Sequence, residues 1–147
     1  MSKKNIYEVF DEFRKATTKA DRINVLRCND TYALKNVLLG ALNKNIKFTV
    51  TEVPQFRREP MPPGMAYNNM TGALDRAYLF TEGNPRVPAG LTEKRKMEIL
   101  IQILESLEEK EADVFAGMLT KDLKVPYLTE ALVSEAFPGL LLSLIHI

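Results

Sequence analysis

Apolar residues recur at every third or fourth position through most of the chain, and this spacing most constrains its fold. Such a period gives a helix one apolar stripe to bury. Helices are expected at about residues 5–15, from Thr17 or Thr18 to about Cys28-Asn29, from Asp30 or Thr31 to about Asn43, at 70–80, from Thr92 to about 107, at 111–119, and from Thr129-Glu130 to about 136. The side chains expected to face inward are Ile6, Val9, Phe10, Phe13, Ile23, Leu26, Leu34, Val37, Leu38, Leu42, Met97, Leu100, Ile101, Leu104, Val114, Phe115, Met118, Leu132, Val133 and Ala136. Because the first helices are joined by short connections, the sequence predicts an all-α, irregular helical bundle with antiparallel neighbours.

Polar residues mark the expected helix ends, because their side chains can accept hydrogen bonds from the first turn. The expected N-caps are Thr17 or Thr18, Asp30 or Thr31, Thr92, and Thr129 with Glu130. The expected ends are Cys28-Asn29, Asn43 and, for the last helix, Phe137-Pro138-Gly139.

A cluster of prolines interrupts the helical pattern. Pro54, Pro60, Pro62, Pro63 and Gly64 lie within eleven residues. Proline is excluded from helix interiors, so residues 51–66 are expected to form a long proline-rich crossing loop. Just before it, residues 46–50 alternate in polarity and predict a short extended segment. The whole of residues 1–141 is expected to form a single helical domain.

Charge is unevenly distributed, although the net charge of the chain is only +1. Residues 1–50 carry ten Lys/Arg against five Asp/Glu, whereas residues 91–135 carry six against ten. A basic N-terminal part can attract phosphate, and it can equally be a solvated helical surface.

Cysteine content and hydropathy indicate the compartment. Cys28 is the only cysteine, so no intramolecular disulfide can form, which suits a reducing cytosol. Residues 1–13 are too polar for a signal peptide, and no apolar run approaches the roughly 18 residues of a membrane span. We therefore expect a cytoplasmic protein without a membrane partner.

The last six residues, LSLIHI (142–147), are similar to the translation of a common transposase sequencing adapter. We expect this hexapeptide to be an artefact of sequencing, which would also remove the only histidine, His146, from any function. The alternative is a natural apolar tail in which Leu144 and Ile145 pack on the domain.

Motifs of catalysis are absent from the sequence. There is no glycine-rich phosphate loop, no CxxC pair and no His/Cys/Asp cluster, so we expect no enzyme activity, no cofactor and no metal site. Five carboxylates gather near residues 105–113, namely Glu105, Glu108, Glu109, Glu111 and Asp113. A two-metal nuclease would need them to converge on one cavity, and a solvated acidic surface is the expected arrangement.

The stretch FAGMLTKDLKVPYLTEALVSEAFPGL (115–140) resembles the end of the N-terminal DNA-binding domain of ATP-dependent DNA ligases. In that domain a helix ends in Arg/Lys-Asp-Leu, a glycine-containing loop follows, and another helix leads to Pro-Gly-Leu. Residues 121–123 and 138–140 supply the two tripeptides, whereas Pro126-Tyr127 stands near the expected glycine. The lysine nucleophile of a ligase, in Lys-x-Asp-Gly, does not occur in this sequence.

Nearly the whole of residues 5–141 is similar to a family of short uncharacterised proteins of tailed phages, including phages of marine cyanobacteria. The similarity covers the opening NIYEVFDEF, the proline-rich middle, EKRKMEILIQILESLEEKEADVFAGML and LTEALVSEAFPGLL. The resemblance implies a protein of the cytoplasm of an infected bacterial host.

The site expected from these patterns is the loop before the last helix. A helix N-terminus offers free N–H groups to phosphate, and Lys121 and Lys124 lie just before it. Thr129 is expected to cap that helix and to reach a phosphate oxygen, with Arg57, Arg58 and the N-terminal lysines as further contacts. Both loop lysines are expected to be exposed and to contribute little to stability. The competing interpretation is that Thr129 only caps the helix, the lysines are solvated and Phe137 is core.

Three functions remain open from the sequence. The first is a non-catalytic phage accessory protein that binds double-stranded DNA through its phosphate backbone. The second is a protein–protein adaptor, without DNA binding, for phage or host replication and repair proteins. The third is the N-terminal fragment of an ATP-dependent DNA ligase, which a Lys-x-Asp-Gly motif downstream in the untruncated gene would establish.

Overall fold

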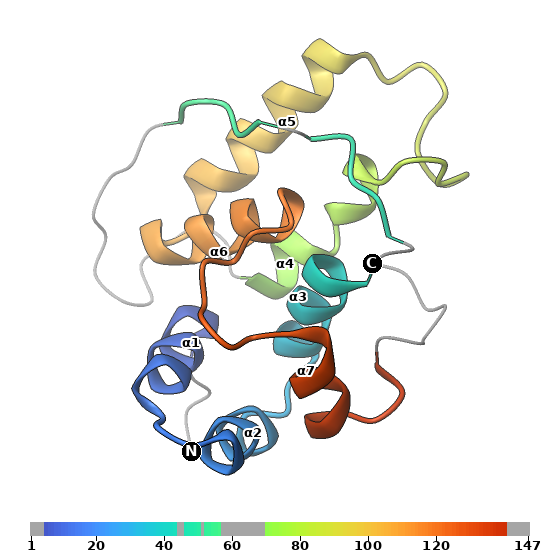
Figure 1. Ribbon diagram of the computed structural model, residues 1–147. Coiled ribbons are helices and arrows are strands. Elements are labelled where there is room, and N and C mark those ends of the chain that lie inside the picture. The colour runs from blue at the N-terminus through green and yellow to red at the C-terminus, as the bar shows by residue number, and fades with distance from the viewer. Residues whose placement is uncertain (1–4, 44–45, 51, 57–69, 141–147) are drawn as a thin grey trace.

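The computed structural model describes residues 5–43, 46–50, 52–56 and 70–140, and within these residues the protein is helical and has no strand (Figure 1). The helices are α1 (Ile6–Lys15), α2 (Lys19–Cys28), α3 (Tyr32–Leu42), α4 (Met70–Leu74), α5 (Glu93–Ser106), α6 (Glu109–Leu119) and α7 (Glu130–Ala136). A 3-10 helix, η1 (Ala77–Phe80), follows α4. The predicted all-α fold class is confirmed.

Helix α6 is the centre of the bundle. It packs against α1, α3, α4 and α5, while α2 packs against α1 and α7 (Figure 1). Phe115 and Met118 of α6 are fully buried, as are Phe10 and Phe13 of α1. All seven α-helices contribute to one continuous apolar core. This arrangement puts α2, which has three basic residues and one acidic residue, and the basic C-terminal end of α1 beside the chain that leaves α6 (Figure 1).

The threonine caps are found where the sequence predicts them. Thr18, Thr31, Thr92 and Thr129 each accept a hydrogen bond from the N–H three residues further on. Thr18 is the cap of α2 rather than Thr17, and Thr31 is the cap of α3 rather than Asp30. Asp30 instead forms an ion pair with Lys35 at 2.6 Å. These ends need only local contacts, which is why the sequence locates them well.

The helix predicted around residues 70–80 is wrong as a single element. It divides into α4 and η1, with Asp75 and Arg76 between them. Phe80, at the end of η1, accepts a hydrogen bond on its carbonyl from the Thr49 N–H at 2.7 Å, next to an isolated β-bridge between Phe48 and Thr81. Within the short segment predicted to be extended just before the proline-rich loop, Phe48 forms this isolated bridge.

Two further details differ from expectation in the second half of the chain. The buried face of α5 is formed by Ile99, Leu100, Ile103 and Leu104, and the expected Met97 and Ile101 are only partly buried. Both sets of residues have helical spacing, and the packing of α5 against α6 decides that Ile99, Leu100, Ile103 and Leu104 are buried. Helix α6 begins at Glu109 rather than at 111, because the Ala112 N–H already bonds the Glu108 carbonyl at 2.8 Å. The expected inward residues Ile23 and Leu42 are likewise only partly buried.

Two predicted segments lie largely or wholly outside the described residues. Residues 52–56 are described and are not helical, whereas most of the proline-rich loop (57–69) and the terminal hexapeptide (142–147) are not described. Among the described helices, none is both long enough and apolar enough to cross a membrane.

Candidate nucleic-acid interface

Helix α6 ends in a tight left-handed turn. The Asp122 N–H donates to the Gly117 carbonyl at 2.8 Å and the Lys121 N–H donates to the Met118 carbonyl at 3.2 Å. These two bonds form a Schellman motif, in which the residue after the cap is usually glycine. Here that residue is Lys121, with φ of 61°. The turn directs the chain back across the end of α6 towards α1 and α2.

Gly117 makes this turn sterically feasible. A Cβ built at Gly117 would lie 2.8 Å from the backbone oxygen of Asp122 and 3.3 Å from Cα of Leu123. A contact of 2.8 Å is closer than side chains tolerate, and its partner is backbone rather than a flexible side chain. The close approach of the loop to α6 therefore depends on glycine at this position.

The loop between α6 and α7 contains three residues in the left-handed conformation. Lys121, Lys124 and Tyr127 have φ values of 61°, 57° and 67°, a region that costs a non-glycine residue about 1–2 kcal/mol. The Asp122 carboxylate accepts a hydrogen bond from the Lys124 N–H at 3.1 Å, which stabilises the second of these turns. Tyr127 stands near the glycine of the ligase pattern, and its backbone has the conformation that favours glycine.

Lys121 is exposed, yet its ammonium is hydrogen-bonded within the fold. Its ammonium donates to the carbonyls of Gly40 and Asn43, at the C-terminal end of α3, the latter at 3.0 Å. It also lies 5.1 Å from the centre of the Phe48 ring. Burial lowers the pKa of the Lys121 ammonium from its usual value. The exposure expected for this lysine is confirmed, and its ammonium also lies at the negative end of the α3 dipole, where a positive charge is favourable.

We expect Lys121→Met to lower the free energy of unfolding by about 1–2 kcal/mol, because the last carbonyls of α3 lose a charged donor. Lys124→Met is the matched control. It also has positive φ in the same loop and is exposed, and it lies away from the α3 carbonyls that the Lys121 ammonium bonds, so its effect should remain within about 0.5 kcal/mol. Urea denaturation of the two variants tests the difference, and equal stabilities would show that the Lys121 ammonium contributes nothing to α3.

The other predicted site residues are placed as follows. Thr129 caps α7, and its hydroxyl oxygen accepts the Leu132 N–H at 3.3 Å. Phe137 is 8% exposed and belongs to the core. Arg57, Arg58 and the lysines at positions 3 and 4 lie outside the described residues. Lys121 and Lys124 are therefore the predicted cations that are described and exposed at the loop, and of these the Lys121 ammonium is bonded to the α3 carbonyls.

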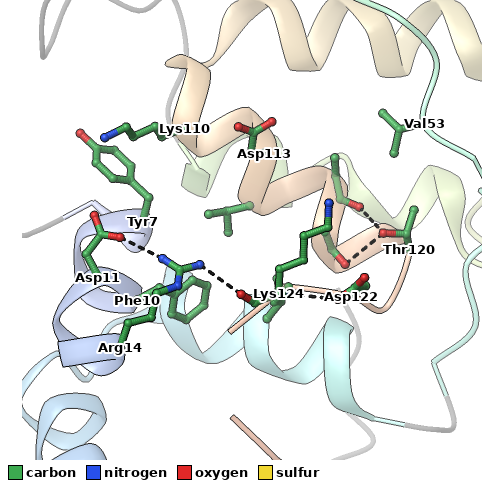
Figure 2. Close-up of a pocket in the computed structure, with 14 residues that line it drawn as sticks. Tyr7, Phe10, Asp11, Arg14, Val53, Lys110, Asp113, Thr120, Asp122 and Lys124 are labelled. Carbon is green, nitrogen blue, oxygen red and sulfur yellow. Dashed lines mark hydrogen bonds and ion pairs between the residues drawn. The ribbon is translucent and has the colours of Figure 1, made fainter. Parts of the chain in front are cut away.

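A cleft of about 580 Å³ lies between α1, α6 and the loop, and Figure 2 shows the residues that line it. Arg14, at the end of α1, reaches across to the loop. Its guanidinium pairs with Asp11 at 2.9 Å and donates to the Lys124 carbonyl at 3.4 Å. Lys110 of α6 lines the same cleft. The Arg14 side chain thus contacts the backbone of a residue 110 positions later, and Arg14, Lys110 and Lys124 all line the cleft.

Helix α2 adds a third basic residue beside the loop. The Arg22 guanidinium lies 4.0 Å from the centre of the Tyr127 ring. We call Arg14, Arg22 and Lys124 the basic surface. Sequence reasoning missed Arg14 and Arg22 as site residues, and the only signal for them was the excess of Lys and Arg in residues 1–50.

Other basic residues of α2 have partners within the fold. The Arg27 guanidinium donates to the carbonyls of Glu135 and Ala136, at the C-terminal end of α7. Lys19 pairs with the Glu135 carboxylate at 2.8 Å. These contacts hold α7 against α2, so the basic character of α2 serves the packing of α7 as well as the open surface.

The carboxylates near residues 105–113 do not all form a solvated surface. Glu111, in the first turn of α6, is 5% exposed, and its carboxylate accepts a hydrogen bond from the Tyr7 N–H at 3.1 Å. It therefore caps the N-terminus of α1 from outside that helix. Burial raises the pKa of the Glu111 carboxyl to about 7, and the nearby charges of Glu108 and Glu8 act in the same direction.

Glu108 completes this junction between the two helices. It accepts hydrogen bonds from the Tyr7 hydroxyl at 2.9 Å and from the Asn5 side chain at 3.3 Å. The expected solvated acidic surface is thus wrong for Glu111 and Glu108, which connect α6 to α1 by hydrogen bonds. In the part of the chain that the structure describes, no three His, Cys, Asp or Glu side chains gather in a way that could hold a metal ion.

Comparison with known proteins assigns the chain to a protein family. No curated protein sequence matches the chain. Residues 9–125, which run from within α1 through α6 to the Schellman turn and Lys124, match DUF6433, described as a family of unknown function. Since the match covers most of the sequence, the chain belongs to the DUF6433 family.

Proposed function

We propose that the protein is a non-catalytic accessory protein of a tailed phage, which binds double-stranded DNA through its phosphate backbone in the cytoplasm of the bacterial host. The observation that carries this proposal is the meeting of Arg14 from α1 and Lys124 from the loop, with Arg22 of α2 on the same loop. Phosphate contacts made by Lys and Arg supply most of the affinity of sequence-independent DNA binding.

The basic surface retains donors for a phosphate. A guanidinium has five N–H donors, and the contacts of Arg14 with Asp11 and the Lys124 carbonyl leave several of them open to solvent. The side chains of Arg14 and Lys124 are exposed. The carboxylates of Asp11 and Asp122 accept hydrogen bonds from Arg14 and from the Lys124 N–H, which reduces their repulsion of an approaching anion.

The uneven charge of the chain also supports DNA binding at the basic surface. The ten Lys/Arg of residues 1–50 include the basic residues of α1 and α2, whereas eight of the ten Asp/Glu of residues 91–135 lie in α5, α6 and α7 and the other two are Glu108 and Asp122. A DNA duplex would be attracted to the first group and repelled by the second. Three phosphate contacts predict weak, sequence-tolerant binding, because such contacts position a protein without reading bases.

Binding to duplex DNA should therefore depend strongly on salt. Titration of a labelled duplex at low ionic strength should show saturable binding, and log K should fall with log salt with a slope of about −3 for three phosphate contacts. Arg14→Glu combined with Lys124→Glu should weaken binding alike for unrelated duplexes and make the slope shallower by about 2.

The matched control is Lys94→Glu combined with Arg95→Glu. It changes the net charge by the same amount in the exposed first turn of α5, away from the loop, and should leave most of the affinity. Equal losses in the two double variants would show that only net charge matters and would contradict a defined interface.

A protein–protein adaptor is the second candidate, and the acidic character of residues 91–135 favours it. Its partner would be a phage or host replication or repair protein with a basic surface. This function predicts no detectable binding to duplex DNA even at low salt, where electrostatic attraction is strongest. The same titration therefore separates the two candidates.

A further inference from the structure

Tyr127 is an unusual residue for the loop in which it lies. It is 66% exposed, and its backbone has φ of 67°. An aromatic residue in this conformation loses stability relative to glycine, and its ring recovers little by burial. The protein thus presents a large aromatic ring to solvent at the edge of the basic surface, where glycine would suit the backbone better.

One face of that ring is covered by a cation. The Arg22 guanidinium lies 4.0 Å from the ring centre, within the range of stacking and cation–π contact. Since two thirds of Tyr127 remains exposed despite this contact, the ring still has area on which a second planar group can stack. The guanidinium also restricts the orientation of the ring, which reduces the entropy that a ligand would have to overcome.

The surroundings of the ring are suited to a phosphate-bearing ligand. Lys124 precedes Tyr127 by three residues, so the two Cα atoms are at most about 11 Å apart. That distance corresponds to about three nucleotides at 3.4 Å of rise per strand. Arg14 contacts the Lys124 backbone and Arg22 contacts the Tyr127 ring, so a cation accompanies each of these two loop residues. Aromatic rings beside cations are the usual elements of sites for unpaired nucleotides.

We infer that Tyr127 is a stacking site for an unpaired base, so that the DNA preferred by this protein is a duplex carrying an extrahelical base beside its phosphate backbone. This inference rests on the proposed DNA binding and specifies its substrate. In the bound state the base would stack on the open face of the Tyr127 ring, with Arg22 on the other face. Lys124 and Arg14 would contact the adjoining phosphates.

The test compares an intact labelled duplex with the same duplex carrying one unpaired adenine, each titrated with the full chain. The wild-type protein should bind the bulged duplex about tenfold more tightly, since stacking of one base on an aromatic side chain has an effect of that order. Tyr127→Gly should bind both duplexes equally, and it relieves the backbone strain, so loss of folding is not expected to confuse the result. Tyr127→Phe should keep the preference because it keeps the ring.

Tyr32 supplies the matched control. It is 58% exposed in the first turn of α3, outside the loop, and Tyr32→Ala should keep the tenfold preference. Equal affinity of the wild-type protein for both duplexes, or a preserved preference in Tyr127→Gly, would overturn the inference while leaving backbone binding intact. Absence of binding to the intact duplex at low salt as well as to the bulged one would overturn the proposed function itself.

Discussion

Glu111→Gln is expected to stabilise the protein at pH 8 and to remove a large part of its pH dependence. Burial raises the pKa of Glu111 from 4.5 to about 7, so the folded state holds a proton that the unfolded state has already released between these values. The contribution of this group to the stability of the folded state is therefore fully present below about pH 4.5, and it is lost as the pH rises to about 7. With 1.36 kcal/mol for each pKa unit, the loss from this one group is about 3 kcal/mol.

The physical cause is the position of Glu111 between two helices. Its carboxylate caps the N-terminus of α1 through the Tyr7 N–H, which favours charge, yet its burial and the nearby carboxylates of Glu108 and Glu8 oppose charge more strongly. Glutamine keeps an oxygen that can accept the Tyr7 hydrogen bond and has no charge to desolvate. The variant should therefore be stabilised relative to the wild type at pH 8 and not at pH 4.5.

Chemical denaturation at a series of pH values measures this difference. Other carboxylates also titrate in this range, so the quantity to follow is the stability of Glu111→Gln minus that of the wild type, which should rise with pH. Glu93→Gln, in the exposed first turn of α5, should show a difference that stays small at every pH. A difference for Glu111→Gln that does not change with pH would mean that the carboxyl titrates normally.

Gly117→Ala is expected to destabilise the protein by about 1–3 kcal/mol, which is the usual effect of forcing an extra methyl group into a closely packed site. The new Cβ would lie 2.8 Å from the Asp122 backbone oxygen, so the Schellman turn has to open or shift. The direction of the stability change is informative, because alanine in a helix interior is otherwise favoured over glycine by about 1 kcal/mol. For a chain of this size the melting temperature should fall by several degrees.

Gly90→Ala is the control for this substitution. A Cβ at Gly90 meets nothing within 4 Å, and stability should remain within about 0.5 kcal/mol. Gly117→Ala should also weaken DNA binding, because displacement of the turn moves Lys124 away from Arg14. A stabilised Gly117→Ala variant would show that the loop can move without cost and that glycine has no steric role there.

Much of the fold follows from patterns within the sequence. The period of apolar residues predicts the helices, and the threonines locate four of their N-termini, with Thr18 and Thr31 chosen from the two candidates at each site. These features depend on residues three or four positions apart, so the local sequence contains the information. The apolar side chains of α1, at positions 6, 9, 10 and 13, are buried as predicted for the same reason.

Other features required contacts between distant segments. Residues 97–104 contain two overlapping apolar stripes, and only packing against α6 selects Ile99 and Ile103 over Met97 and Ile101. The predicted helix at 70–80 is divided into α4 and η1, and Phe80 at its end bonds Thr49, more than thirty positions earlier. Among neighbouring glutamates, Glu111 is nearly fully buried because it faces the N-terminus of α1, and no property of residues 105–113 distinguishes it.

The candidate site likewise has features that follow from local sequence and features that depend on contacts between distant segments. By itself the sequence determined an all-α chain, its caps, and a lysine-bearing loop before the last helix, because helix formation and capping are local. Only the tertiary structure directed the Lys121 ammonium to the end of α3 and brought Arg14 and Arg22 to Lys124 and Tyr127. Those contacts join residues about 80 to 110 positions apart, and they form only when α6 packs at the centre of the bundle and its last turn reverses the chain.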